Sequence, residues 1–122
     1  ASISGSTLNS VFGVNVDSIG NLWISDSSNG RVLYFENGSN FPARALGVSN
    51  FSTVGGGGVS QNVMNQPRRI ALGENGSIYI SDGTDNRVLF IPRDASLPTE
   101  VWGQPNFSSN GATLTNTGLN IP

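Results

Sequence analysis

The stretch GNLWISD at residues 20–26 returns as GSIYISD at residues 76–82, a spacing of 56 positions between 20 and 76. The same spacing relates RVLY at residues 31–34 to RVLF at residues 87–90. Matches of this length in one register indicate an internal repeat. The chain therefore contains two copies of one structural unit.

Each copy contains four short runs of β-forming residues, separated by Asn, Asp, Gly and Ser. The runs are rich in β-branched and aromatic side chains, as strands are, and no helical periodicity persists for a full helix. The predicted strands cover residues 13–17, 22–25, 31–35 and 44–47 in the first copy, and 69–73, 78–81, 87–91 and 100–103 in the second. Four strands per repeat are typical of a β-propeller blade, and the first strand of each copy should lie innermost.

The order of residues in both copies resembles the NHL repeat. The first copy shows the pattern GxxVDxxGNLWISDxxNxRVL at residues 13–33, and the second departs from it mildly, with Gly73 in place of the first Asp. The resemblance implies an all-β fold, a partial β-propeller with two four-stranded antiparallel blades of NHL type. It says little about function, because such propellers serve as enzymes, scaffolds, and RNA or protein binders.

The repeat also divides the chain into segments. Residues 12–56 form the first predicted blade and residues 68–111 the second, joined by a linker at residues 57–67. The end segments, residues 1–11 and 112–122, resemble each other in sequence. We expect both to be versions of the linker that leads from one blade to the next.

The composition excludes several kinds of chemistry. The chain has no Cys and no His, and its 6 basic residues are all Arg. Ser-His-Asp and Cys-His arrangements are therefore impossible within it, as are Schiff-base chemistry on Lys and a Lys-containing phosphate loop. A pair of carboxylates remains available for acid–base work, but no spacing singles out a pair. The sequence predicts that the chain is not an enzyme and has no catalytic residue, metal site or cofactor.

Charge and hydropathy argue against nucleic acid and membrane as partners. The net charge is −2, the pI is about 4.7, and Arg68-Arg69 is the single adjacent basic pair, so the sequence predicts no broad positive face. No apolar run approaches the roughly 18 residues that a membrane-spanning helix needs. The lack of Lys favours an extracellular or cell-surface location.

Two Asp–Arg pairs occur at equivalent places in the copies, Asp26 with Arg31 and Asp82 with Arg87. Because both copies contain the pair, we interpret it as a structural brace at the turn between the second and third strands. The alternative is a ring of binding sites on one face of the propeller. The run DGTD at residues 82–85 is the nearest approach to a calcium loop, but it lacks further oxygen ligands at fixed spacing.

Four Asn residues begin Asn-x-Ser acceptor sequences for N-linked glycans, namely Asn37, Asn50, Asn75 and Asn106. The first and third are followed by Gly and also suit tight turns. Asn50 and Asn106 follow the fourth strand of each copy. We expect these two to be the better acceptors, provided that the protein passes through a eukaryotic secretory pathway.

A propeller closes its ring with roughly four to eight blades, so two blades leave an apolar face open at each end. The sequence predicts a non-enzymatic structural or adhesive module that associates head-to-tail with copies of itself, as a ring or a filament. The residues expected at that junction are Leu8, Val11, Leu119 and Ile121. Two alternatives remain: a propeller that presents loops to a glycan or protein ligand, and a fragment of an NHL-type lyase or hydrolase whose catalytic residues lie in absent blades.

Overall fold

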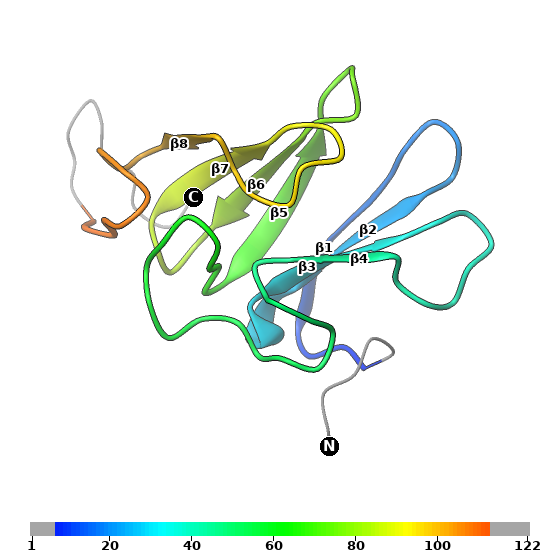
Figure 1. Ribbon diagram of the computed structural model, residues 1–122, viewed down its shortest axis with the longest axis horizontal. Helices are drawn as coiled ribbons and strands as arrows, with labels where there is room; N and C mark the ends of the chain where they lie inside the picture. Colours follow the sequence, from blue (N-terminus) through cyan, green and yellow to red (C-terminus); the bar gives the residue numbers. More distant parts are fainter. Residues whose placement is uncertain (1–6, 113–122) are drawn as a thin grey trace.

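The computed structural model describes residues 7–112. These residues form two four-stranded antiparallel sheets, each with its strands in sequence order (Figure 1). Blade 1 consists of β1 (Val11–Val16), β2 (Leu22–Asp26), β3 (Arg31–Phe35) and β4 (Arg44–Leu46). Blade 2 consists of β5 (Pro67–Leu72), β6 (Ile78–Asp82), β7 (Arg87–Ile91) and β8 (Glu100–Trp102). The predicted all-β fold with two four-stranded antiparallel blades is confirmed.

The strand bounds agree with those predicted from the repeat to within about two residues. β3 and β7 have the predicted bounds, while β1 and β5 each begin two residues earlier than expected. The reason is an irregular register in the first hairpin of each blade, between Val11 and Val14 and between Pro67 and Ile70. A β-bulge of this kind keeps a strand paired past an interruption in its side-chain alternation, which a period-two pattern does not reveal.

Cross-strand pairing gives each blade two distinct faces, because paired residues point to the same side of a sheet. We call one the aromatic face; in blade 1 its members are Trp23, Val32, Tyr34 and Leu46, and in blade 2 they are Tyr79, Val88, Phe90 and Trp102. We call the other the aliphatic face; in blade 1 it carries Val14, Val16, Leu22, Ile24 and Leu33, and in blade 2 Ile70, Leu72, Ile78, Ile80 and Leu89.

The two blades pack with the aromatic face of blade 1 against the aliphatic face of blade 2. Trp23, Val32 and Leu46 form one core cluster with the buried isoleucines of blade 2 and with Met64, which lies in the segment between the blades. Figure 1 shows this segment as the long green connection between β4 and β5. The hydrophobic core therefore lies mainly between the sheets, and each blade depends on its neighbour for burial.

The first strands of the two blades, β1 and β5, approach each other most closely at Gly13. A Cβ at this position would lie 2.2 Å from the backbone carbonyl oxygen of Arg68. Next to this contact, the side-chain amide of Asn15 donates a hydrogen bond to the Ile70 carbonyl at 3.1 Å. No helix within residues 7–112 is long and apolar enough to cross a membrane.

Candidate functional site

The Asp–Arg pair of blade 1 is fully buried. The Nε of Arg31 lies 2.6 Å from Oδ2 of Asp26, and both side chains are 0% exposed. Arg31 also donates to the carbonyl oxygens of Phe51 and Thr7, and the Asn29 amide donates to Asp26 at 2.9 Å. The guanidinium thus connects the β2–β3 hairpin to the segments before β1 and after β4. This geometry is that of a brace, since the charged groups face backbone rather than solvent.

Blade 2 holds the same pair with a second carboxylate added. The Arg87 guanidinium lies 3.2 Å from Asp82 and 3.3 Å from Asp85, and all three side chains are fully buried. The Asn65 amide donates to both oxygens of Asp85 at 2.7 Å. Sequence analysis paired Asp82 with Arg87 but did not place Asp85 in this contact. Comparison of the two copies could have identified Asp85, because it is equivalent to Asn29 and has a carboxylate where the first copy has an amide.

Two carboxylates therefore share one guanidinium in the described part of blade 2. Burial raises the pKa of Asp82, and the neighbouring Asp85 charge raises it further, while hydrogen bonds from the backbone N–H groups of Gln66 and Asn65 oppose the rise. A carboxyl whose pKa is raised in the folded state binds a proton more readily there than in the unfolded chain. Its stabilising contribution is complete below the ordinary value of 3.8, and it is lost as the pH rises through the folded-state pKa.

We expect Asp85→Asn to stabilise the protein at pH 7, because it removes the second buried carboxylate charge beside Asp82. The new amide can donate to Asp82, as Asn29 donates to Asp26 in blade 1. The gain in stability should shrink as the pH falls, because Asp82 then takes up a proton in the parent chain and the repulsion that the variant relieves is no longer present. Urea unfolding at several pH values measures the effect.

The reciprocal change Asn29→Asp is the matched control for Asp85→Asn. It places a second buried carboxylate beside Asp26 and should destabilise the chain at pH 7, with recovery on acidification. The interpretation is wrong if Asp85→Asn lowers the stability at pH 7, because the second carboxylate would then be a net stabilising partner of Arg87.

The outer side of blade 1 exposes valines at positions that are covered where the two blades meet. Val14 and Val16 of the aliphatic face are 60% and 56% exposed. The equivalent positions in blade 2, 56 residues later, are Ile70 and Leu72. Ile70 is 9% exposed and Leu72 packs against the core cluster, because blade 1 lies over them. Ile24 and Leu33 of the same face are already buried, so among the described residues Val14 and Val16 mark the part of this face that a further blade would cover.

The outer side of blade 2 shows the complementary exposure on its aromatic face. Tyr79 and Trp102 are 39% and 43% exposed, whereas the equivalent Trp23 and Leu46 of blade 1 are 6% and 2% exposed. The Tyr79 ring centroid lies 5.0 Å from that of Phe90 and 5.9 Å from that of Trp102. This aromatic cluster is open to solvent, whereas blade 2 covers the equivalent residues of blade 1.

The residues predicted to mediate self-association lie near these surfaces only in part. Leu8 and Val11 are exposed at the start of blade 1, whereas Leu119 and Ile121 lie outside the described residues. Sequence analysis missed Val14, Val16, Tyr79 and Trp102. The repeat shows which residue of the other blade is equivalent to each of them. Only the packing of blade 1 on blade 2 shows which residue of each equivalent pair is buried.

The four predicted acceptor asparagines are exposed in the structure. Asn50 and Asn106 lie in turns after the fourth strands, where each Oδ1 accepts the backbone N–H two residues later at 2.9 Å. Asn37 uses its side-chain amide to bind the Ile19 carbonyl at 3.0 Å, and Asn75 accepts from the Ser77 hydroxyl at 2.8 Å. These contacts do not separate Asn50 and Asn106 from the other two acceptors, and glycosylation at all four positions stays a prediction.

No family model matches the sequence, and no curated protein matches it. Among solved structures, the chain is similar to selenomethionine-substituted virginiamycin B lyase from Staphylococcus aureus, a β-propeller, with a TM-score of 0.57 and 11% sequence identity. The match covers 98% of this chain and 37% of the lyase chain. At this identity the likeness establishes the fold, which is that of a partial β-propeller.

The prediction that the chain is not an enzyme is wrong in the form derived from the sequence, since the solved structure it matches is an enzyme. The missing His, Cys and Lys exclude particular chemistries within this chain, but they do not exclude an enzyme built on this fold. The chain spans a little over a third of the lyase, and one fold can host many different functions. The likeness assigns no reaction to this chain.

Proposed function

We propose that the chain is a structural module of a β-propeller whose outer blade faces associate head-to-tail with further copies of the same chain. The observation that carries the proposal is the exposure of apolar residues at positions whose equivalents are buried between the two blades. Blade 1 presents Val14 and Val16, and blade 2 presents Tyr79 and Trp102. The aromatic face of one copy would pack on the aliphatic face of the next, in the way that blade 1 packs on blade 2.

Such a junction joins different surfaces of identical chains, so it is heterologous. Heterologous contacts close into a ring when the rotation between copies closes, and extend into a filament when it does not. Three copies would supply six blades. They would also supply at least as much polypeptide as the lyase chain, of which this chain matches 37%. We favour the closed ring, because closure removes both open faces.

The proposed junction differs from the internal one at the innermost strand. Position 69 is equivalent to Gly13, so Arg69 occupies the place where the internal junction tolerates no Cβ. The backbone of β5 must therefore lie farther from β1 of the next copy than β1 lies from β5 within one chain. Near the axis of the proposed ring, the two copies are therefore in less close contact. The apolar faces farther from the axis provide most of the head-to-tail contact.

The native mass of the purified chain tests the proposal. We expect a mass that is an integer multiple, greater than one, of 12.8 kDa, measured by light scattering after size exclusion. Val16→Asp and Trp102→Asp, one on each face, should each yield the monomer, since a charge buried in an apolar contact is costly. Val54→Asp is the matched control, because Val54 is an equally exposed valine of the segment between the blades.

The variant Arg69→Gly tests the same junction in the opposite direction. It makes the second junction equivalent to the first at the innermost strand, so we expect the assembly to dissociate at a lower protein concentration than the parent assembly does. A parent chain that stays monomeric at every concentration contradicts the proposal. Unchanged assembly in both aspartate variants contradicts the assignment of the faces.

We also infer that the blades are of the NHL type, on the pattern at residues 13–33 and its copy 56 positions later. The exposed acceptors at Asn50 and Asn106, together with the lack of Lys, support an extracellular or cell-surface location. In an assembled ring both asparagines lie after the fourth strand of a blade, away from the innermost strands.

A further inference from the structure

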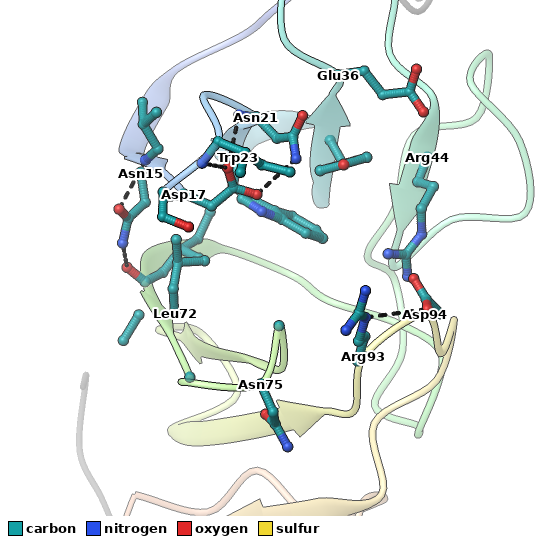
Figure 2. Close-up of a pocket in the computed structure, with 18 of the residues that line it drawn as sticks. Asn15, Asp17, Asn21, Trp23, Glu36, Arg44, Leu72, Asn75, Arg93 and Asp94 are labelled. Carbon is teal, nitrogen blue, oxygen red and sulfur yellow. Dashed lines mark hydrogen bonds and ion pairs between the residues drawn. The ribbon is translucent and has the colours of Figure 1, made fainter.

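A groove of about 1140 Å³ lies between the two blades, at the end where the β1–β2 and β5–β6 turns lie (Figure 2). Binding sites for small molecules typically have volumes of about 300–1,000 Å³, so the groove has room for one or more sugar-sized units. It belongs to the junction within one chain. Assembly through the outer faces therefore neither forms nor covers it.

One wall of the groove is aromatic and has polar groups without partners. The Trp23 and Tyr34 ring centroids lie 4.5 Å apart, and the Arg44 guanidinium carbon lies 5.6 Å and 5.9 Å from them. Trp23 is 94% buried, yet its indole N–H makes no hydrogen bond within the described residues and is not sealed from solvent. The Tyr34 hydroxyl likewise makes none there. Because the Trp23 nitrogen is not among the buried unpaired polar atoms of the described residues, solvent can reach it, and a ligand hydroxyl in the groove can replace that water.

The charges around the groove have both signs. Glu36 and the Arg93–Asp94 pair lie on its rim (Figure 2). Arg44 of blade 1 donates a hydrogen bond to the Ala95 carbonyl of blade 2. A charged ligand would meet groups of its own sign on one side of the groove. A neutral polyhydroxylated ligand finds an acceptor in each carboxylate and a donor in each guanidinium, because a hydroxyl can act as either.

The Tyr34 hydroxyl stays protonated in this setting. Burial raises its pKa, and the negative charges of Asp17 and Glu36 raise it further. The phenol therefore offers both a donor and an acceptor over the ordinary pH range.

The polar groups of the groove are those that the repeat does not preserve. Their equivalents in blade 2 differ in chemistry: Tyr34 corresponds to Phe90, Glu36 to Pro92 and Arg44 to Glu100. The braces, in contrast, keep their Asp and Arg in both copies. Packing at position 34 needs only an aromatic ring, as Phe90 shows. The hydroxyl and the charges are thus additions at this one junction rather than requirements of a blade.

We propose that this groove binds a neutral saccharide, with the Trp23 indole N–H, the Tyr34 hydroxyl and the Glu36 carboxylate as hydrogen-bonding groups. The sugar ring would lie against the exposed part of the Tyr34 ring, because the apolar C–H face of a sugar packs on aromatic carbon. Arg44, which also lines the groove, lies over both rings and helps to position them.

Nuclear magnetic resonance of the two indole N–H groups tests the proposal, since the chain has 2 tryptophans. The full chain is titrated with neutral hexoses, N-acetylhexosamines and their disaccharides. The charged controls are glucuronate and glucosamine. We expect a saturable shift of the Trp23 indole signal with at least one neutral sugar, while the Trp102 signal stays in place.

Tyr34→Phe should weaken binding about three- to tenfold, the value of one net hydrogen bond, and Glu36→Gln should weaken it to a similar extent. Glu36 is an exposed side chain, so its variant keeps the fold even if Tyr34→Phe does not. Tyr79→Phe is the matched control, because it keeps the aromatic ring of β6 in blade 2 and removes only a hydroxyl that lies outside the groove.

Three results would overturn the proposal. The first is the absence of any saturable shift at millimolar concentrations of every neutral sugar. The second is tighter binding of a charged sugar than of its neutral parent. The third is unchanged affinity in both groove variants. The native mass is measured in the same samples, so a monomeric chain that binds sugar would contradict the proposed assembly alone.

Discussion

Arg87→Met will lower the free energy of unfolding at pH 7 by about 3–5 kcal/mol, the usual cost of leaving a buried charge without its partner. The change removes the one guanidinium that faces both Asp82 and Asp85. It also leaves three backbone carbonyls without this donor, those of Ser60, Val63 and Phe107. Methionine fills much of the same volume, so the loss reports on charge and hydrogen bonding rather than on a cavity.

The loss should depend on pH in a defined direction. Without the guanidinium, the folded-state pKa of Asp82 rises further, because the Arg87 charge that lowers it is gone. Part of the lost stability is therefore recovered as the pH falls and Asp82 takes up a proton. Urea unfolding of the Arg87→Met variant at neutral and mildly acidic pH, at one protein concentration, measures both effects.

Two arginine variants serve as controls. Arg31→Met, in blade 1, leaves one buried carboxylate without its guanidinium instead of two. It should therefore lower the free energy of unfolding by less than Arg87→Met does. Arg93→Met breaks an ion pair whose side chains are 73% and 85% exposed, and such pairs contribute about 0–1 kcal/mol. If Arg87→Met costs no more than Arg93→Met, the buried cluster is not a brace.

The second large effect is expected from Gly13→Ala, which adds one methyl group where β1 meets β5. The added Cβ would lie 2.2 Å from the carbonyl oxygen of Arg68. A backbone oxygen cannot rotate away as a side chain can, so the strands must separate. We expect a destabilisation at the upper end of the about 1–3 kcal/mol that overpacking usually costs.

The site of the damage distinguishes this effect from a general loss of stability. Separation of the strands should break the hydrogen bond from Asn15 to the Ile70 carbonyl and speed amide exchange in β1 and β5 before that in β3 and β7. Gly58→Ala is the matched control, since a Cβ there meets nothing within 4 Å. Equal stability of the two variants would show that the blades are not in close contact at Gly13.

The proposals for assembly and for saccharide binding use different surfaces of the same chain. Assembly uses the open aliphatic face of blade 1 and the open aromatic face of blade 2, whereas the groove uses the aromatic face of blade 1 that blade 2 partly covers. A ring of three copies would thus contain three such grooves. Both proposals rest on differences between equivalent positions of the repeat.

The sequence by itself determined the two four-stranded sheets and their strands to within about two residues, and it indicated the Asp–Arg pair of each hairpin but not the added Asp85. These features are local. A strand follows from alternation over four or five residues, a hairpin from the turn that joins neighbours, and the pairs Asp26–Arg31 and Asp82–Arg87 each span a single hairpin. Because each of these features occurs in both copies of the 56-residue repeat, the sequence predicts them without the tertiary structure.

The tertiary structure alone decided which positions are covered and which groups meet across the blades. Asn65 reaches Asp85, Gly13 approaches Arg68, and Arg44 crosses to the Ala95 carbonyl, although these partners lie 20 to 55 positions apart. Contacts between distant segments depend on how one sheet is placed on the other, and neither alternation nor turn chemistry encodes that placement. Equivalent residues such as Trp23 and Tyr79 therefore have the same local structure but different burial, because a blade lies over the first and none lies over the second.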